Sequence, residues 1–212
     1  MTTPFPELRR GLVAILRGLR PQEAVDIGSA IFEAGIEAIE VPLNSPEPFA
    51  SIEKLVAKLP GGLIGAGTVL SPQDVDRLHD AGGRLLVSPN IDAAVMNRAN
   101  HHGMVTMPGV FTPTEAFQAI GLGASALKFF PASVLGPGGI AAIKAVLPAE
   151  TIVGVVGGVS EADFAGYGKV GVRTFGLGSS LFKPGMTVAM VRERAHAAVD
   201  AYDAAFGGKL DG

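Results

Sequence analysis

Short apolar runs alternate along this chain with longer stretches in which apolar residues recur at helical spacing. Eight runs are rich in apolar or β-branched residues, and they lie at 12–17, 38–42, 63–69, 85–89, 104–108, 126–131, 151–156 and 174–177. Their starts are 19 to 26 residues apart, too far for hairpins, so we expect parallel strands joined by crossover helices. Their nearly continuous apolarity is typical of strands that are covered on both faces.

Signals for helix starts and ends agree with these strands. At residues 71–74 and 112–115, a Ser or Thr is followed by proline and by an acid three positions after the hydroxyl, which predicts a capped first turn. Residues 45–47 and 160–163 are variants of the same start. Gly35 follows a helical stretch and is predicted to end it in the left-handed conformation.

No linker, charge block or change of composition divides the sequence. Eight strand–helix units therefore predict one domain over residues 1–212, an α/β fold of the closed (β/α)8 TIM-barrel type. The alternative is an open, doubly wound sheet. The even spacing of the units and the absence of a GxGxxG opening disfavour that alternative.

Composition narrows the function classes. The sequence has 48 % hydrophobic and 17 % charged residues, as in an ordinary globular protein, and its longest apolar runs are too short to span a bilayer. It contains no cysteine, and its first residues lack the basic and apolar regions of a secretory signal. The net charge of −3 provides no basic surface for nucleic acid. We therefore expect a cytoplasmic protein that binds neither membranes nor nucleic acid.

Four polar residues interrupt the predicted strands near their carboxyl ends, where TIM barrels carry their chemistry. They are Arg17, Glu40, Thr68 and Lys128. Lys128 is the one lysine of seven that lies in an apolar strand-like run, whereas the other six have the polar or helical surroundings of solvated lysines. Burial disfavours the charged amine and lowers its pKa, which can make a lysine nucleophilic near neutral pH.

Each of these residues also has a purely structural interpretation. Glu40 and Lys128 could form a buried salt bridge, Lys128 could extend to the rim of the sheet, and Arg17 could be a rim charge. Thr68 could be an ordinary β-branched strand residue. Because desolvation offsets most of the gain from a buried ion pair, several ionisable groups at one end of one barrel favour a functional site.

Glycine-rich turns follow the last two predicted strands. Gly157 and Gly158 come after the seventh strand, and Gly178 and Ser179 come after the eighth. Such turns let backbone N–H groups approach an anion, and the next helix adds the positive end of its dipole. The two turns together predict a phosphate-binding site.

The four histidines are predicted to lie in helices, at the surface and away from the strand ends; they are His79, His101, His102 and His196. No acid or third histidine joins the adjacent pair His101-His102 at the spacing of metal ligands. We therefore predict no metal site.

The polar strand ends fall within motifs that resemble one enzyme family. These motifs lie, in the family's order, at residues 14–18, 39–46, 65–69, 88–90, 107–109, 127–131 and 156–159. They cover the chain from Leu12 to Ala205 and resemble the 2-keto-3-deoxy-6-phosphogluconate/6-phosphogalactonate (KDPG/KDPGal) aldolases, class I enzymes on a (β/α)8 barrel.

The resemblance implies a role for each matching residue. Lys128 would form a Schiff base with the substrate, and Glu40 would be the general acid and base. Substrate contacts are implied for Arg17, Thr68, Pro89, Val156, Gly157, Gly158, Gly178 and Ser179. Among these, Arg17 and Thr68 would hold the carboxylate of the pyruvate half, and the glycines with Ser179 would hold the 6-phosphate. The resemblance also implies a homotrimer and chemistry that needs no cofactor and no metal.

Two departures from phosphogluconate-type sequences resemble the phosphogalactonate branch. Asn44 stands where that type has an arginine, and Val156 replaces a threonine before the glycine pair. The expected reaction is cleavage of 2-dehydro-3-deoxy-6-phospho-D-galactonate to pyruvate and D-glyceraldehyde 3-phosphate, in galactonate degradation. The alternatives are the gluconate epimer or both epimers, an isomerase or epimerase of phosphorylated sugars on the same barrel, and a binding module without catalysis.

Overall fold

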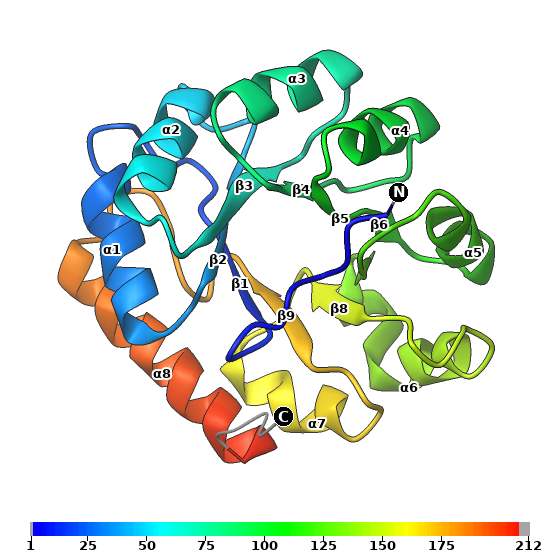
Figure 1. Cartoon of the computed structure of the whole chain (residues 1–212). Helices are drawn as coiled ribbons and strands as arrows, with labels where there is room; N and C mark the ends of the chain where they lie inside the picture. Colours follow the sequence, from blue (N-terminus) through cyan, green and yellow to red (C-terminus); the bar gives the residue numbers. More distant parts are fainter. Residues whose placement is uncertain (1, 208–212) are drawn as a thin grey trace.

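Nine parallel strands form a barrel within residues 2–207, the part of the chain that this computed structural model describes. Helices alternate with the strands and surround them (Figure 1). The strands are β1 (Leu12–Ile15), β2 (Ala38–Pro42), β3 (Leu63–Gly67), β4 (Leu85–Val87), β5 (Val105–Met107), β6 (Gly109–Val110), β7 (Leu127–Phe129), β8 (Val153–Val156) and β9 (Thr174–Leu177). The helices are α1 (Ala24–Ala34), α2 (Pro48–Lys58), α3 (Pro72–Asp80), α4 (Ala93–His101), α5 (Pro113–Gly121), α6 (Ala132–Lys144), the short 3₁₀ helix η1 (Glu161–Asp163), α7 (Phe164–Gly168) and α8 (Val188–Phe206). Within residues 2–207, no helix combines the length and apolarity needed to cross a membrane.

The nine strands occupy eight positions around the barrel, because β5 and β6 are two parts of one position. The strand order is β5-β4-β3-β2-β1-β9-β8-β7-β6, so β5 pairs with β4 and β6 pairs with β7. Pro108 separates β5 from β6 and has no N–H for the ladder, although its carbonyl oxygen accepts a 2.9 Å hydrogen bond from the N–H of Lys128. The predicted eight parallel strand positions and the TIM-barrel fold are confirmed.

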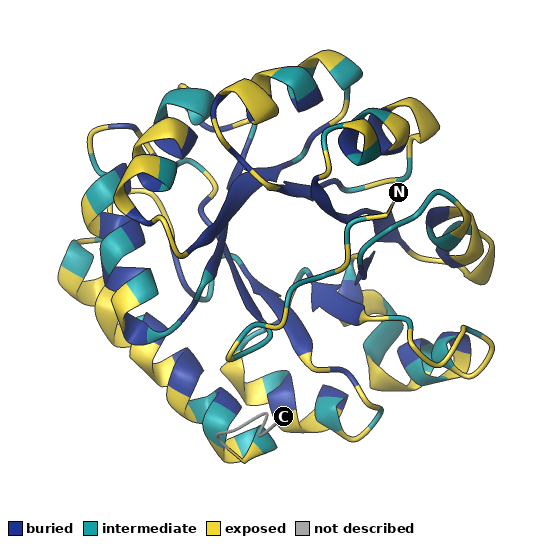
Figure 2. Cartoon of the chain, viewed as in Figure 1, coloured by how far each residue is buried: buried dark blue, intermediate teal, exposed yellow. Residues whose placement is uncertain are grey.

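The strands are buried along their length (Figure 2), and their residues alternate between two apolar layers. In β2, Ile39 and Val41 belong to the large cluster between the strands and the helices. Ala38 belongs instead to a smaller cluster inside the barrel, together with Val13 of β1. Because Glu40 is two residues after Ala38, its side chain also faces the interior.

The segment before β1 covers the amino-terminal end of the barrel. It crosses the barrel opening (Figure 1), and its residues Phe5 and Leu8 pack against the inner cluster. Apolar side chains therefore fill this end. The opposite end, where the strands finish, is left for the polar side chains.

Three of the four predicted helix starts are confirmed. The side chains of Ser71 and Thr112 cap α3 and α5, each accepting a hydrogen bond from the N–H three residues further on. At η1, the N–H of Ser160 donates to Oδ2 of Asp163 at 2.8 Å. Gly35 ends α1 with a φ of 106°, as predicted.

The fourth predicted start, at residues 45–47, is wrong. Helix α2 begins only at Pro48, three residues beyond Ser45. Oγ of the buried Ser45 instead accepts a 2.9 Å hydrogen bond from the N–H of Gly18. A serine hydroxyl can accept from any free N–H nearby, and here the loop after β1 supplies one. This bond ties the loop after β2 to the loop after β1.

Candidate active site

Lys128 and Glu40 project into the barrel interior from β7 and β2. Lys128 follows the inner-cluster residue Ala126 by two positions, as Glu40 follows Ala38, so strand alternation directs both side chains inward. Only 6 % of Lys128 and 2 % of Glu40 is exposed. The structure thus brings these two ionisable residues into one buried interior.

The Glu40 carboxylate occupies space that Gly67 of β3 leaves free. A Cβ at position 67 would overlap both carboxylate oxygens of Glu40. Oε2 of Glu40 is buried and has no hydrogen-bond partner among residues 2–207. The ion pairs of this part of the chain do not include Glu40 with Lys128. A salt bridge therefore does not account for the two buried groups, and the carboxylate is free to bind a substrate.

Burial shifts the pKa of both groups toward neutrality. It raises the pKa of the Glu40 carboxyl to about 7, although the positive charges of Lys128 and Arg17 act in the opposite direction. Burial also lowers the pKa of the Lys128 amine below its ordinary value, a shift that Glu40 opposes and Arg17 increases. Both groups therefore exchange protons closer to neutrality than usual, as nucleophilic and acid–base chemistry requires.

A cavity of about 650 Å³ opens beyond the ends of β1, β8 and β9. Arg17 and Lys183 supply two positive charges to its lining, and no acidic residue between positions 2 and 207 lines it. Six residues of the predicted site line this cavity: Arg17, Val156, Gly157, Gly158, Gly178 and Ser179. A cavity with two cations and two glycine turns is suited to an anionic ligand.

Phe130 connects Lys128 with this cavity. Nζ of Lys128 lies 4.9 Å from the centroid of the Phe130 ring, and Phe130 also lines the cavity. A Cβ at Gly157 would lie 3.0 Å from the same ring. Gly157 also has a φ of 92°, so both space and backbone conformation require glycine there. One aromatic ring thus lies close to both the buried amine and the first glycine turn.

Arg17 is held at the edge of the cavity by Asn44. Nη1 of Arg17 donates a 2.5 Å hydrogen bond to Oδ1 of Asn44, which follows β2. The sequence marks Asn44 only as a departure from phosphogluconate-type relatives. Its contact with Arg17 joins two loops that are distant in sequence, so no local pattern indicates it.

Thr68 and Pro89 follow β3 and β4, but neither lines the cavity. Thr68 has a φ of 57°, in the left-handed region that β-branched residues rarely adopt. Such strain costs on the order of 1–3 kcal/mol and is concentrated at functional sites. Because Thr68 directly follows Gly67, the strained residue lies beside the Glu40 pocket. Substrate contacts by Thr68 and Pro89 stay predictions.

Three polar residues of the cavity lining were not predicted as site residues. They are Ser160, Ser180 and Lys183. The sequence indicates Ser160 only as a helix cap, and Lys183 only as a solvated lysine. The available signal for Ser180 and Lys183 is their position in the same turn as Ser179, directly after the last strand.

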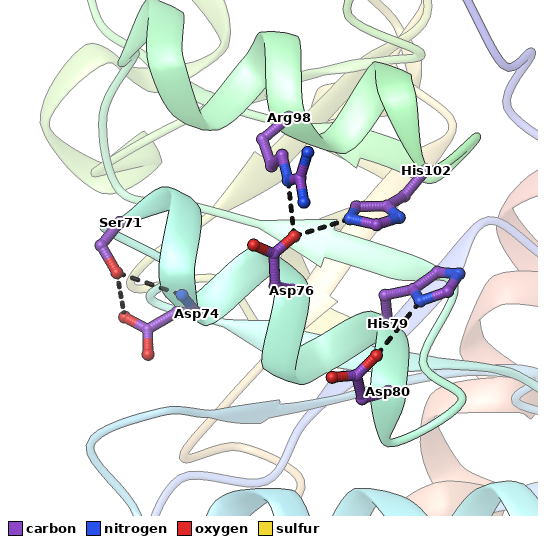
Figure 3. Close-up of polar contacts among 7 residues, drawn as sticks. All are labelled: Ser71, Asp74, Asp76, His79, Asp80, Arg98 and His102. Atoms are coloured by element: carbon purple, nitrogen blue, oxygen red, sulfur yellow. Dashed lines mark hydrogen bonds and ion pairs between the residues drawn. The ribbon is translucent and has the colours of Figure 1, made fainter.

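A polar cluster on α3 and α4 lies outside the barrel (Figure 3). Oδ1 of Asp76 accepts hydrogen bonds from Arg98 at 2.5 Å and from His102 at 2.7 Å. His79 stacks on His102, with ring centroids 4.2 Å apart. His79, His101 and His196 are exposed, as predicted, and His102 beside Asp76 is half-buried. In residues 2–207, no three His, Asp or Glu side chains gather as a metal-binding group.

Known proteins resemble this chain over most of its length. The sequence profile of the KDPG and KHG aldolases matches residues 7–189. The chain is 60 % identical over 207 residues to the probable 2-dehydro-3-deoxy-6-phosphogalactonate aldolase of Rhizobium meliloti (strain 1021), covering 97 % of this chain and 98 % of that protein. It is 47 % identical over 192 residues to the 2-dehydro-3-deoxy-6-phosphogalactonate aldolase of Escherichia coli (strain K12), covering 90 % and 94 %. A solved structure described as native KDPGal superposes with a TM-score of 0.93 at 45 % identity, covering 95 % of this chain and 98 % of that one. With Lys128 and Glu40 in one barrel interior, the chain belongs to the KDPG and KHG aldolase family and is a carbon–carbon lyase.

Proposed function

We propose that this aldolase cleaves 2-dehydro-3-deoxy-6-phospho-D-galactonate into pyruvate and D-glyceraldehyde 3-phosphate, through a Schiff base on Lys128. The observation that carries the proposal is the buried Lys128 amine, which shares the barrel interior with the unpartnered carboxylate of Glu40. The names of the two curated relatives support the choice of substrate.

Lys128 starts the reaction as a neutral amine, the form that burial favours. Nζ attacks the C2 ketone, and the resulting carbinolamine takes up a proton and loses water to give an iminium ion. The iminium then accepts the electron pair of the C3–C4 bond as that bond breaks. This electron sink is what an unactivated ketone lacks.

Glu40 moves the protons of the cleavage step. As a carboxylate it takes the proton of the C4 hydroxyl, C3–C4 breaks, and the aldehyde leaves as D-glyceraldehyde 3-phosphate. The electron pair remains in the enamine on Lys128. Protonated Glu40 returns its proton to C3, and hydrolysis of the iminium releases pyruvate, a proton and the free neutral amine. A pKa of about 7 suits a group that both takes and returns a proton.

The two anionic ends of the substrate match the cavity. Arg17, oriented by Asn44, binds the C1 carboxylate through charge-assisted hydrogen bonds, together with the hydroxyl of Thr68. Pro89, which follows β4 outside the cavity lining, would contact the substrate on the side of Thr68. The 6-phosphate binds at the two glycine turns, through Gly157, Gly158, Gly178 and Ser179.

Val156 is the residue on which the choice of epimer depends. It lines the cavity directly before Gly157 and presents methyl groups where phosphogluconate-type relatives present a threonine hydroxyl. A valine cannot hydrogen-bond the C4 hydroxyl of either epimer, so a preference based on that bond is lost. The gluconate epimer, or both epimers, is the alternative substrate.

An isomerase or epimerase is the alternative in another class. Such an enzyme would keep the glycine turns and could use Glu40 as its base, but it would not need an imine on Lys128. Membership of an aldolase family favours aldol cleavage. A binding module without catalysis is disfavoured because a binder gains nothing from a desolvated lysine.

The same proposal includes the assembly and cellular role of the enzyme. A single barrel domain over residues 1–212 would act as a homotrimer in the cytoplasm, in galactonate degradation.

The experiment is a comparison of kcat/KM for the two C4 epimers, with pyruvate and glyceraldehyde 3-phosphate measured separately. The proposal expects both products in equal amounts from the galactonate epimer, at an efficiency at least equal to that for the gluconate epimer. Conversion of the sugar acid without release of pyruvate would support the isomerase alternative instead.

A further inference from the structure

We infer that Lys183 supplies the positive charge that binds the substrate's phosphate, and that it thereby makes this aldolase select phosphorylated sugar acids. The inference rests on the proposed function, which defines the phosphate end of the substrate. It assigns a binding role to a residue that the sequence presents as a solvated surface lysine.

The turn after β9 fixes the backbone of Lys183 at the cavity. Gly178 closes this turn, because its carbonyl oxygen accepts 2.9 Å hydrogen bonds from the N–H groups of Leu181 and Phe182. Leu181 and Phe182 are almost fully buried, so the turn is anchored in the core immediately before Lys183. Phe182 and Lys183 both line the cavity.

Pro184 anchors the turn on the other side of Lys183. It packs so closely against Gly18 that a Cβ at position 18 would lie 2.6 Å from Cγ of Pro184. Gly18 directly follows Arg17, and Pro184 directly follows Lys183. The contact between Gly18 and Pro184 therefore holds the two cationic residues in neighbouring loops. The lysine backbone therefore has little freedom, while its long side chain can reach a ligand in the cavity.

The charges around the cavity leave the phosphate to Lys183. A sugar acid phosphate carries a carboxylate and a phosphate, the latter with a charge of about −1.5 to −2 at pH 7. Arg17 and Lys183 are the two cations among the lining residues. Arg17 donates a hydrogen bond to Asn44, and the proposed function assigns it to the carboxylate. Without Lys183, the phosphate would contact only neutral N–H and hydroxyl groups.

Neighbouring residues do not neutralise Lys183 or replace it. Among residues 2–207, no acidic side chain forms an ion pair with Lys183. Arg194 of α8 is close to the turn, but its Nη1 donates to the carbonyl oxygens of Ser179 and Ser180, at 3.3 and 3.1 Å. Arg194 does not line the cavity, so it stabilises the turn from behind it.

The test compares Lys183→Gln and Lys183→Arg with wild type, and uses Lys169→Gln as a matched control because Lys169 is exposed at the end of α7 and outside the cavity. Lys183→Gln should raise KM for the phosphorylated acid by roughly tenfold to hundredfold, the scale of a hydrogen bond to a charged group, with a smaller effect on kcat. It should also weaken inhibition by inorganic phosphate. Lys183→Arg should restore most of both effects, and high salt should reduce the difference from wild type.

Pyruvate separates this role from a general one, since pyruvate carries the carboxylate and no phosphate. The pyruvate concentration that half-saturates imine trapping by borohydride should be affected far less by Lys183→Gln than KM for the phosphorylated acid. Equal losses in the two assays, or no change in KM and in phosphate inhibition, would overturn the inference.

Failure of the proposed function would look different. A wild-type enzyme that cleaves neither epimer would refute that function, and calorimetric titration of wild type and Lys183→Gln with inorganic phosphate would still decide the role of Lys183. Weaker phosphate binding by the variant supports the inference, and equal binding refutes it.

Discussion

Oδ1 of Asn44 accepts a hydrogen bond from Nη1 of Arg17 across the ends of two neighbouring strands, with 2.5 Å between the atoms. A second bond of 2.9 Å, from the N–H of Gly18 to Oγ of Ser45, joins the same two loops. The direction of the Arg17 guanidinium is therefore set by residues after β2. A substrate carboxylate would meet a cation that is already oriented.

Asn44→Ala should weaken carboxylate binding because Arg17 loses the partner that orients it. We expect KM for the sugar acid and the half-saturating pyruvate concentration to rise together, by about threefold to tenfold, the scale of one hydrogen bond. Steady-state kinetics and borohydride trapping measure the two values. Asn97→Ala, on the exposed face of α4, is the matched control. An unchanged pyruvate dependence would show that Asn44 does not act through the carboxylate.

Glu40→Gln should reduce cleavage by roughly 10²–10⁴-fold while pyruvate imine formation persists, because the amide keeps the shape but cannot accept the proton. The pH dependence of kcat shows which protonation state of Glu40 is active. Burial raises the pKa of Glu40 to about 7, so the carboxylate form is lost as pH falls through that value, and wild-type kcat should fall with it. Low pH also protonates the Lys128 amine, which must be neutral to attack, although its lowered pKa keeps the neutral form present at a lower pH than for an ordinary lysine.

Comparing two pH profiles separates these groups. Trapping with pyruvate depends on Lys128, whereas cleavage depends on both Lys128 and Glu40. A Glu40→Gln variant with near-normal turnover, or with the same fall in kcat near pH 7 as wild type, would identify another group as the base.

Gly67→Ala should displace the catalytic carboxylate, since a methyl group at position 67 would overlap both oxygens of Glu40. We expect a strong loss of cleavage with a smaller loss of pyruvate trapping, which needs Lys128 rather than Glu40. Gly166→Ala in α7 is the matched control, because a Cβ there would meet no atom within 4 Å. If both glycine variants keep wild-type kcat, the Glu40 pocket is not as confined as the packing indicates.

Val156→Thr should raise relative activity on the gluconate epimer, because the new hydroxyl can hydrogen-bond one C4 configuration. One neutral hydrogen bond corresponds to about threefold to tenfold in the ratio of kcat/KM values. The measurement is kcat/KM for both epimers with wild type and variant. A strong gluconate preference in the wild type, or an unchanged ratio in the variant, would show that Val156 does not determine the choice of epimer. Asn44 would then be the next residue to test.

Periodicity and strand alternation predict most of this fold and the centre of its site. The eight strand positions follow from apolar runs at regular spacing, and Lys128 stands out because a lysine is unusual inside such a run. Both properties are local, and parallel strands bring their carboxyl ends to one face whatever the loops do.

Contacts between loops were not predictable in the same way. Ser45 stands in a sequence typical of a helix cap, yet its hydroxyl accepts a hydrogen bond from the N–H of Gly18. This partner depends on the position of another loop. Lys183 and Asn44 likewise acquire their positions from turns whose geometry depends on distant residues. Such pairings carry no periodic signal, so they become visible only in three dimensions.

The central claim is that the neutral amine of Lys128 forms an imine, and borohydride reduction in the presence of pyruvate tests it most directly. Intact mass and peptide mapping should find one reduced adduct per chain, on Lys128. The yield should be unchanged after EDTA treatment and in Lys169→Gln, and the adduct should be absent in Lys128→Met. An adduct spread over surface lysines, or no adduct at all in the wild type, would contradict the Schiff-base mechanism.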